Sequence, residues 1–172
     1  FSADKPSEGS HNFSAFTASV LQLRPESTGH LELRSSEPDD HPAIHPKYLA
    51  TTTDCDTIVA GIKVARAICG TEPVKSLITD EHSPGPNVGK NDDEAILEWA
   101  RNTATTIYHP TGTCKMGSDE MAVVNDRLQV HGIDGLRVAD ASIMPVITSG
   151  NTNAPAIMIG EKASDMVLKE AM

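Results

Sequence analysis

The chain has 172 residues and a formal net charge of −10 at pH 7, and this acidic balance argues against binding to nucleic acid or to an anionic membrane surface. Hydrophobic residues make up 38% of the sequence and aromatic ones only 3%, so the core must consist mainly of aliphatic side chains and alanine. No apolar run approaches the length of a membrane span. The three cysteines, Cys55, Cys69 and Cys114, follow no regular spacing, which predicts reduced thiols in a cytoplasmic protein.

The first part of the chain predicts a pair of antiparallel strands. Side chains alternate between two faces over 13–23, and they alternate again over 30–35, after a turn that contains Pro25 and Gly29. Because the two segments are consecutive and joined by this turn, we expect them to pair with each other. The three prolines in 36–46 predict a loop after the second strand.

Two helices are expected next. The first covers 54–69 and can be capped by Thr53 or Asp54. Its apolar residues recur at helical spacing: Ile58, Ile62, Ala65 and Cys69. The second begins at Asn91, where Glu94 stands three residues on, as in a capping box.

The last third predicts two short strands and a final helix. The strands are expected at 127–130 and 136–139, on either side of a glycine-containing turn. Pro155 then stands in the first turn of the helix, where its missing N–H group costs no hydrogen bond. This helix carries an apolar stripe of Ile159, Ala163, Met166 and Val167.

Two polar loops about forty residues apart are the most informative features of the chain. The first is the run 106–117, in which His109 lies between Tyr108 and Pro110, and the second is the run 149–155. Together they resemble the active-site pair of the glucose–methanol–choline (GMC) oxidoreductases, the FAD-dependent alcohol oxidases and dehydrogenases. Weaker similarities to the family lie at 22–33, 46–49 and 136–145, so that the resemblance extends from about residue 14 to residue 172.

The resemblance implies a mixed fold, α+β or α/β, that forms the C-terminal portion of a two-domain flavoenzyme. It would contain an antiparallel substrate-domain sheet with helices, and the last strand and helix of a Rossmann-like FAD domain. Residues 1–130 would then be part of the substrate-binding domain, with the histidine loop, and residues 131–172 would complete the FAD-binding domain. The wording of the motifs is most similar to the bacterial choline dehydrogenase and alcohol dehydrogenase branch.

One family feature is missing from the sequence. Members normally carry a Gly-x-Gly-x-x-Gly turn that receives the FAD pyrophosphate, and no such turn occurs here. The chain also starts at Phe1 rather than at a methionine. We therefore expect the C-terminal third of an enzyme that requires the N-terminal portion of the same enzyme as its partner, and that is inactive and binds FAD weakly without it.

The resemblance also implies the catalytic residues. His109 would be the general base that takes the hydroxyl proton of a small alcohol, because an imidazole exchanges protons near neutral pH. Asn151 would be its hydrogen-bonding partner at the substrate oxygen, since an amide orients an oxygen without carrying charge. A primary alcohol would become an aldehyde as hydride leaves for flavin N5.

Five further residues are expected to contact the FAD. Thr152, Asn153 and Pro155 stand at the start of the final helix, whose N–H groups and dipole would favour the negative charge of the reduced flavin. Asp140 and Ala141 follow a strand that would return to the FAD-domain sheet, at the end where ligands meet an open α/β sheet.

Two other functions and one metal site are considered beside this hypothesis. Hydroxynitrile lyases share the family fold and use a similar polar pair, and an inactive fragment could act only as a binding or assembly module. His41 and His45 have the spacing of a helical metal pair, but Pro42 and Pro46 exclude that helix, so we predict no metal site.

Overall fold

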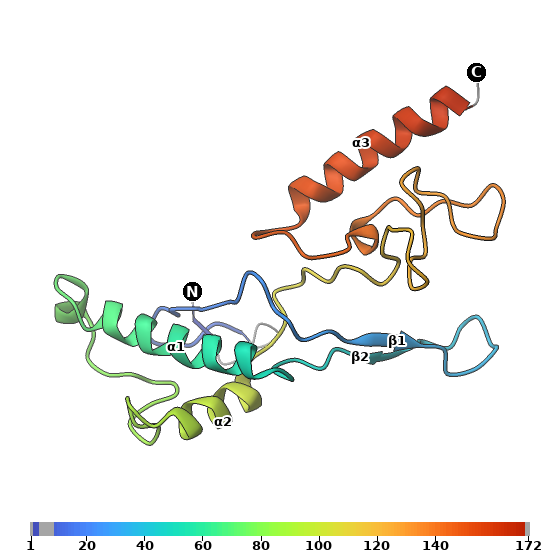
Figure 1. Ribbon diagram of the computed structural model, residues 1–172. Helices are drawn as coiled ribbons and strands as arrows, with labels where there is room; N and C mark the ends of the chain where they lie inside the picture. The colour runs from blue at the N-terminus through green and yellow to red at the C-terminus, as the bar shows by residue number, and fades with distance from the viewer. Residues whose placement is uncertain (1, 4–8, 171–172) are drawn as a thin grey trace. The chain divides into compact units, whose positions relative to one another are not determined.

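The computed structural model describes residues 2–3 and 9–170, which form two compact units. The first unit comprises 1–28 and 47–105, and the second comprises 29–46 and 106–172. The elements in chain order, labelled in Figure 1, are β1 (His30–Glu32), β2 (Ala43–His45), α1 (Thr52–Cys69), the 3-10 turn η1 (Val74–Leu77), α2 (Asp93–Thr103), the 3-10 turn η2 (Ala141–Ile143) and α3 (Asn153–Glu170). The expected domain boundary between 1–130 and 131–172 concerns the complete enzyme and stays a prediction.

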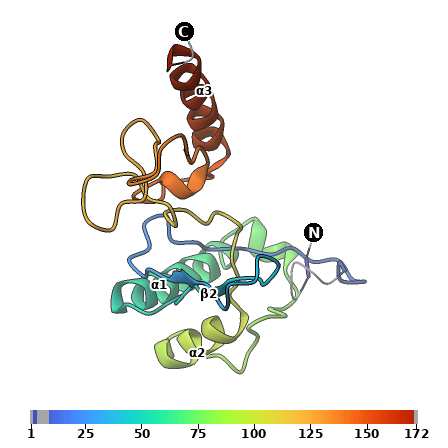
Figure 2. The same cartoon turned by 90° about the vertical axis from the view of Figure 1, so that its right-hand side faces the viewer.

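The first unit is built on α1 and α2, which lie side by side (Figures 1 and 2). Both predicted helices are confirmed, with caps that differ by one or two residues. Thr51 Oγ1 accepts the Asp54 N–H at 3.3 Å, and Asp92 accepts the Ala95 N–H at 3.0 Å. Side chains from both helices form a common buried core: Val59, Ile62, Ile96 and Ala100.

Asp54 also connects two segments of the first unit, the one that ends at Thr28 and the one that begins at Lys47. Its carboxylate is buried and accepts the N–H groups of Glu26 at 2.9 Å and Ser27 at 2.8 Å. Ser27 Oγ in turn accepts the Ala50 N–H at 2.9 Å. Burial raises the pKa of Asp54, but the hydrogen bonds from Ser27 and Glu26 outweigh it and hold the pKa below its ordinary value.

The predicted pairing of the segments 13–23 and 30–35 is wrong. β1 pairs antiparallel with β2, from the proline-containing segment that was expected to be a loop. Pro42 and Pro46 flank β2 rather than interrupt it, so they remove no ladder hydrogen bond from its interior. The segment 13–23 is not a strand; its Val20 instead packs against α1 over Gly61, where an added Cβ would lie 3.3 Å from the Val20 Cβ.

The second unit has its own core, formed where α3 packs on η2 and on the loops before it. The two strands expected at 127–130 and 136–139 occur only as isolated bridges, among them Gln129 to Arg137. The buried side chains are Val124, Leu128, Ile143, Met144, Ile159 and Ala163. Of the apolar stripe predicted for the last helix, Ile159, Ala163 and Met166 face this core, whereas Val167 is exposed.

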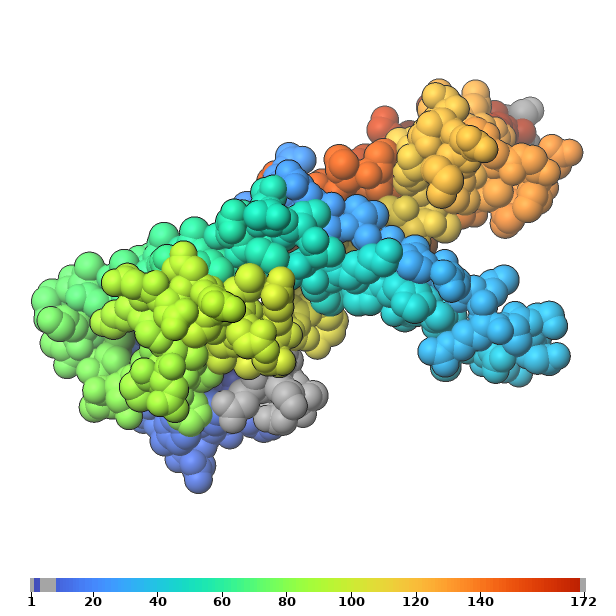
Figure 3. All heavy atoms as spheres, turned by 60° about the horizontal axis from the view of Figure 1, so that its bottom comes forward, coloured from blue at the N-terminus to red at the C-terminus, as the bar shows by residue number. Residues whose placement is uncertain are grey.

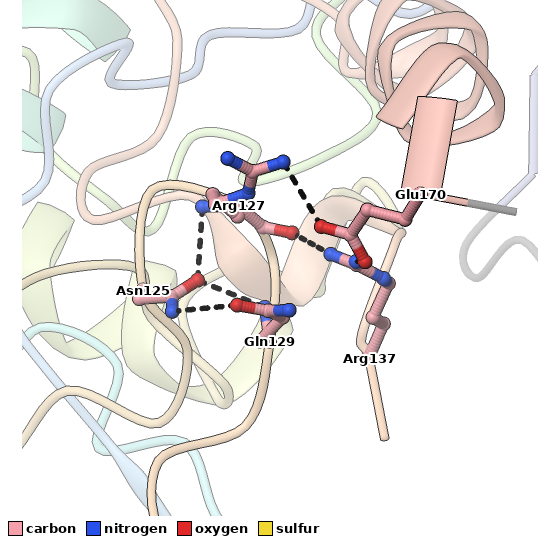
Figure 4. A network of polar contacts seen from close by, with 5 residues as sticks. All are labelled: Asn125, Arg127, Gln129, Arg137 and Glu170. Carbon is pink, nitrogen blue, oxygen red and sulfur yellow. Dashed lines mark hydrogen bonds and ion pairs between the residues drawn. The ribbon is translucent and has the colours of Figure 1, made fainter. Parts of the chain in front are cut away.

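A polar network fastens the C-terminal end of α3 (Figure 4). Glu170 forms ion pairs with Arg127, at 3.0 Å, and with Arg137. Asn125 Oδ1 accepts the backbone N–H groups of Arg127 and Gln129. These two hydrogen bonds stabilise the turn that contains Arg127. The hydrogen bond from Arg137 is the largest effect that holds the pKa of Glu170 below its ordinary value. The positive charges of Arg137 and Arg127 lower this pKa further.

All three cysteines are free, as predicted. Within residues 2–3 and 9–170, no helix has both the length and the apolar character that crossing a bilayer requires.

Candidate active site

His109 lies in an irregular loop between α2 and the core of the second unit. Tyr108 precedes it with φ of 64°, a left-handed conformation that is uncommon for a bulky residue. The Tyr108 N–H donates to Thr106 Oγ1 at 3.0 Å, and this contact closes a tight turn. Strained backbone of this kind persists where its surroundings fix it, so the position of the half-buried His109 is set by the fold.

The imidazole of His109 is bound by Thr152. His109 Nδ1 lies 2.9 Å from Thr152 Oγ1, although the two residues are 43 positions apart, and Thr152 is only 8% exposed. The contact involves Nδ1 and not the other ring nitrogen, Nε2. The sequence predicts Thr152 as a cofactor contact and does not reveal this pairing, because a hydroxyl in the second loop carries no information about its partner.

Backbone hydrogen bonds also connect the histidine loop to η2. The Cys114 N–H donates to the Ser142 carbonyl at 3.0 Å, and the Met116 N–H donates to the Ile143 carbonyl at 2.7 Å. Because η2 packs against α3, the loop that carries His109 and the loop that carries Thr152 belong to one packed body.

The second polar loop leads directly into α3. This helix begins at Asn153, so Thr152, Asn153 and Pro155 stand at its N-terminus, where the first N–H groups lack intrahelical partners. Asn151 is exposed, and in the described part of the chain it makes no hydrogen bond with His109. A role for Asn151 at the substrate oxygen stays a prediction.

Asp140 and Ala141 have structural contacts of their own. Asp140 Oδ1 accepts the Ser142 N–H at 2.8 Å and caps η2. Ala141 is half-buried and packs against the core of the second unit. A contact of either residue with FAD stays a prediction.

Comparison with known proteins identifies the family. The family model described as GMC oxidoreductase matches residues 25–160. The chain belongs to the glucose–methanol–choline oxidoreductase family.

Two relatives and one solved structure define the similarity more closely. The chain is 44% identical over 155 residues to an alcohol dehydrogenase [acceptor] of Pseudomonas putida, covering 90% of this chain and 28% of the relative. It is 46% identical over 152 residues to an oxygen-dependent choline dehydrogenase of Cronobacter sakazakii, covering 88% of this chain and 27% of the relative. A structure of Aspergillus oryzae formate oxidase, described as showing the effect of a mutation on FAD modification, superposes with a TM-score of 0.79 at 29% identity, over 86% of this chain and 26% of that one.

These similarities confirm the predicted family and fold class. The two-stranded antiparallel sheet with its helices corresponds to the C-terminal part of the GMC fold. The chain spans about 28% of the length of the first curated relative that it matches.

Proposed function

We propose that this chain is the C-terminal part of an FAD-dependent enzyme that oxidises a primary alcohol to an aldehyde. The observation that carries the proposal is the His109–Thr152 hydrogen bond, which joins the two polar loops of the sequence at one place beside Asn151. The relatives bear the names of an alcohol dehydrogenase and a choline dehydrogenase, which favours oxidation over the cleavage of a cyanohydrin.

His109 is the general base in this proposal. Thr152 occupies Nδ1, so the ring presents Nε2 to the substrate hydroxyl and takes its proton there. Asn151 donates from its side-chain amide to the same substrate oxygen, which orients the alcohol carbon without adding a charge. FAD, when bound, supplies N5 as the hydride acceptor.

The start of α3 fits an anionic cofactor edge. Its first N–H groups are free of intrahelical partners, and the first turn of the helix contains no acidic side chain that would oppose a negative charge. Thr152, Asn153 and Pro155 are the residues that would hold the flavin ring there, with Asp140 and Ala141 nearby in the chain. The pyrophosphate of FAD requires groups that this sequence does not supply.

The N-terminal portion of the same enzyme is the proposed partner of the chain. Large apolar side chains are exposed in both units, including Phe16, Leu77 and Leu33, which is 88% exposed. Their burial by a further part of the enzyme would remove apolar surface from water. Without that portion, we expect the chain to bind FAD weakly and to be inactive.

Replacing His109 with alanine in the complete enzyme tests the proposed base. We expect anaerobic flavin reduction by an alcohol to slow by about 10²–10⁴-fold, the usual contribution of a positioned base. The matched control is His131→Ala, because His131 is an exposed histidine of the same unit whose ring Nε2 lies 3.1 Å from the Gly117 carbonyl oxygen. Reduction of the His109→Ala enzyme at the parental rate would refute the role of His109.

A further inference from the structure

We propose that His30, His45 and Glu32 form a zinc-binding site on the β1–β2 hairpin, separate from the residues proposed for alcohol oxidation. The three side chains offer ligand atoms that all lie within 4.8 Å of one another. Two imidazoles and one carboxylate are a ligand set that Zn²⁺ accepts, with its remaining position left to water.

The strand register places the three side chains on one face. His30 is directly opposite His45, and Glu32 lies two residues after His30 on the same strand. Side chains alternate along a strand, and opposite residues share a face, so all three point the same way. The residue opposite Glu32 is Ala43, whose methyl group leaves the carboxylate free to lean toward the histidines.

Contacts within the hairpin already bring these groups together. The rings of His30 and His45 stack with their centroids 4.7 Å apart, and His30 Nε2 lies 2.9 Å from Glu32 Oε1. Ligands on a tetrahedral zinc ion at bond lengths near 2.0–2.1 Å lie roughly 3.3 Å apart. Modest rotations of the exposed rings are therefore enough to direct all three atoms at one ion.

Gly29 makes this close approach possible. An added Cβ at Gly29 would lie 2.1 Å from the His45 carbonyl oxygen and 2.8 Å from the Pro46 Cα atom. Any other residue at this position would push the two strands apart directly beside the histidine pair. Because Gly29 has no side chain, the two strands can lie close enough together to bring His30 next to His45.

The site is accessible to an ion from solution. His30, Glu32 and His45 are all exposed, and atoms of the segment 29–46 appear in blue and cyan in Figure 3. The strands have only three residues each, and a short isolated hairpin is marginally stable in water. A bound zinc ion would act as a clip that holds β1 and β2 in register.

Titration of the metal-stripped full protein with ZnCl₂, followed by calorimetry, tests the site. We expect one Zn²⁺ per chain to bind saturably. The variants His30→Ala and His45→Ala should each weaken that binding at least about tenfold, since even changes outside the first ligand shell typically cost 10–100-fold. Glu32→Gln should weaken it as well, because it removes the carboxylate charge.

His41→Ala is the matched control, because His41 is an exposed histidine of the same hairpin that lies outside the cluster. This variant should bind zinc as the parent does. Absence of saturable binding, or binding that persists unchanged in both His30→Ala and His45→Ala, would overturn the proposal. Since the site lies outside the proposed active site, flavin reduction by the complete enzyme should stay unchanged in these variants whether or not zinc binds.

Discussion

At the scale of single residues, the candidate active site depends on a pair of side chains that are distant in the sequence. The sequence predicts that the loops of His109 and Asn151 act together, because both resemble loops of one family's active site. It does not predict that Thr152 holds the imidazole, since that bond joins residues 43 positions apart and depends on the packing of α3 against η2. Local patterns indicate which residue types carry chemistry, whereas their hydrogen-bond partners are fixed by tertiary structure.

Replacing Thr152 with valine should remove this bond and keep the shape of a buried side chain. A hydrogen bond contributes about 0.5–1.5 kcal/mol, so we expect flavin reduction by the complete enzyme to slow by about two- to tenfold. Thr152→Ser, which keeps the hydroxyl, should restore the rate.

Thr113→Val is the control for this experiment, because Thr113 is an exposed threonine of the histidine loop. It should leave the rate unchanged. If Thr152→Val also leaves the rate unchanged, Thr152 does not position the base.

At the scale of elements, the helices follow from the sequence, whereas of the predicted strand pair only the segment 30–35 forms a strand, as β1. The helix predicted at 54–69 matches α1 because its apolar spacing and its capping residues are local signals. The strand pairing fails because strand periodicity specifies faces and not partners. β1 therefore pairs with a segment that its prolines had marked as a loop. The segment 13–23, despite its alternation, packs on α1 instead of forming a ladder.

The start of α1 offers a stability test at this scale. Because hydrogen bonds from Ser27 and Glu26 lower the pKa of Asp54 in the folded state, its contribution is present above the unfolded pKa and is lost as the pH falls through the folded pKa. Asp54→Asn should cost about 1–3 kcal/mol of unfolding free energy at pH 7, since it weakens two charge-assisted hydrogen bonds in a buried place.

Urea unfolding of the full protein at pH 7 and near pH 3 measures this effect. The parent should lose more stability between the two pH values than Asp54→Asn does. Asp56→Asn, at an exposed position of the same helix, should behave like the parent. Equal acid sensitivity of the parent and Asp54→Asn would show that the buried carboxylate does not link stability to pH.

At the scale of the whole molecule, each of the two units has its own core, and the chain passes from the first to the second twice. It leaves the first unit after Thr28 and returns at Lys47. Hydrogen bonds of Asp54 and Ser27 connect the segments on either side of this interval. This organisation could not be predicted from the sequence. The hairpin 29–46 belongs to the second unit, although the segments that precede and follow it in the chain belong to the first unit. The family and the fold class could be predicted, because their motifs are short and local.

The most direct test of the proposed function is anaerobic mixing of the complete enzyme with a panel of primary alcohols while flavin absorbance is recorded. We expect at least one alcohol to bleach the flavin and to yield the corresponding aldehyde. A complete enzyme that keeps its oxidised flavin spectrum with every alcohol, but releases cyanide from a cyanohydrin, would contradict the proposal and identify a lyase.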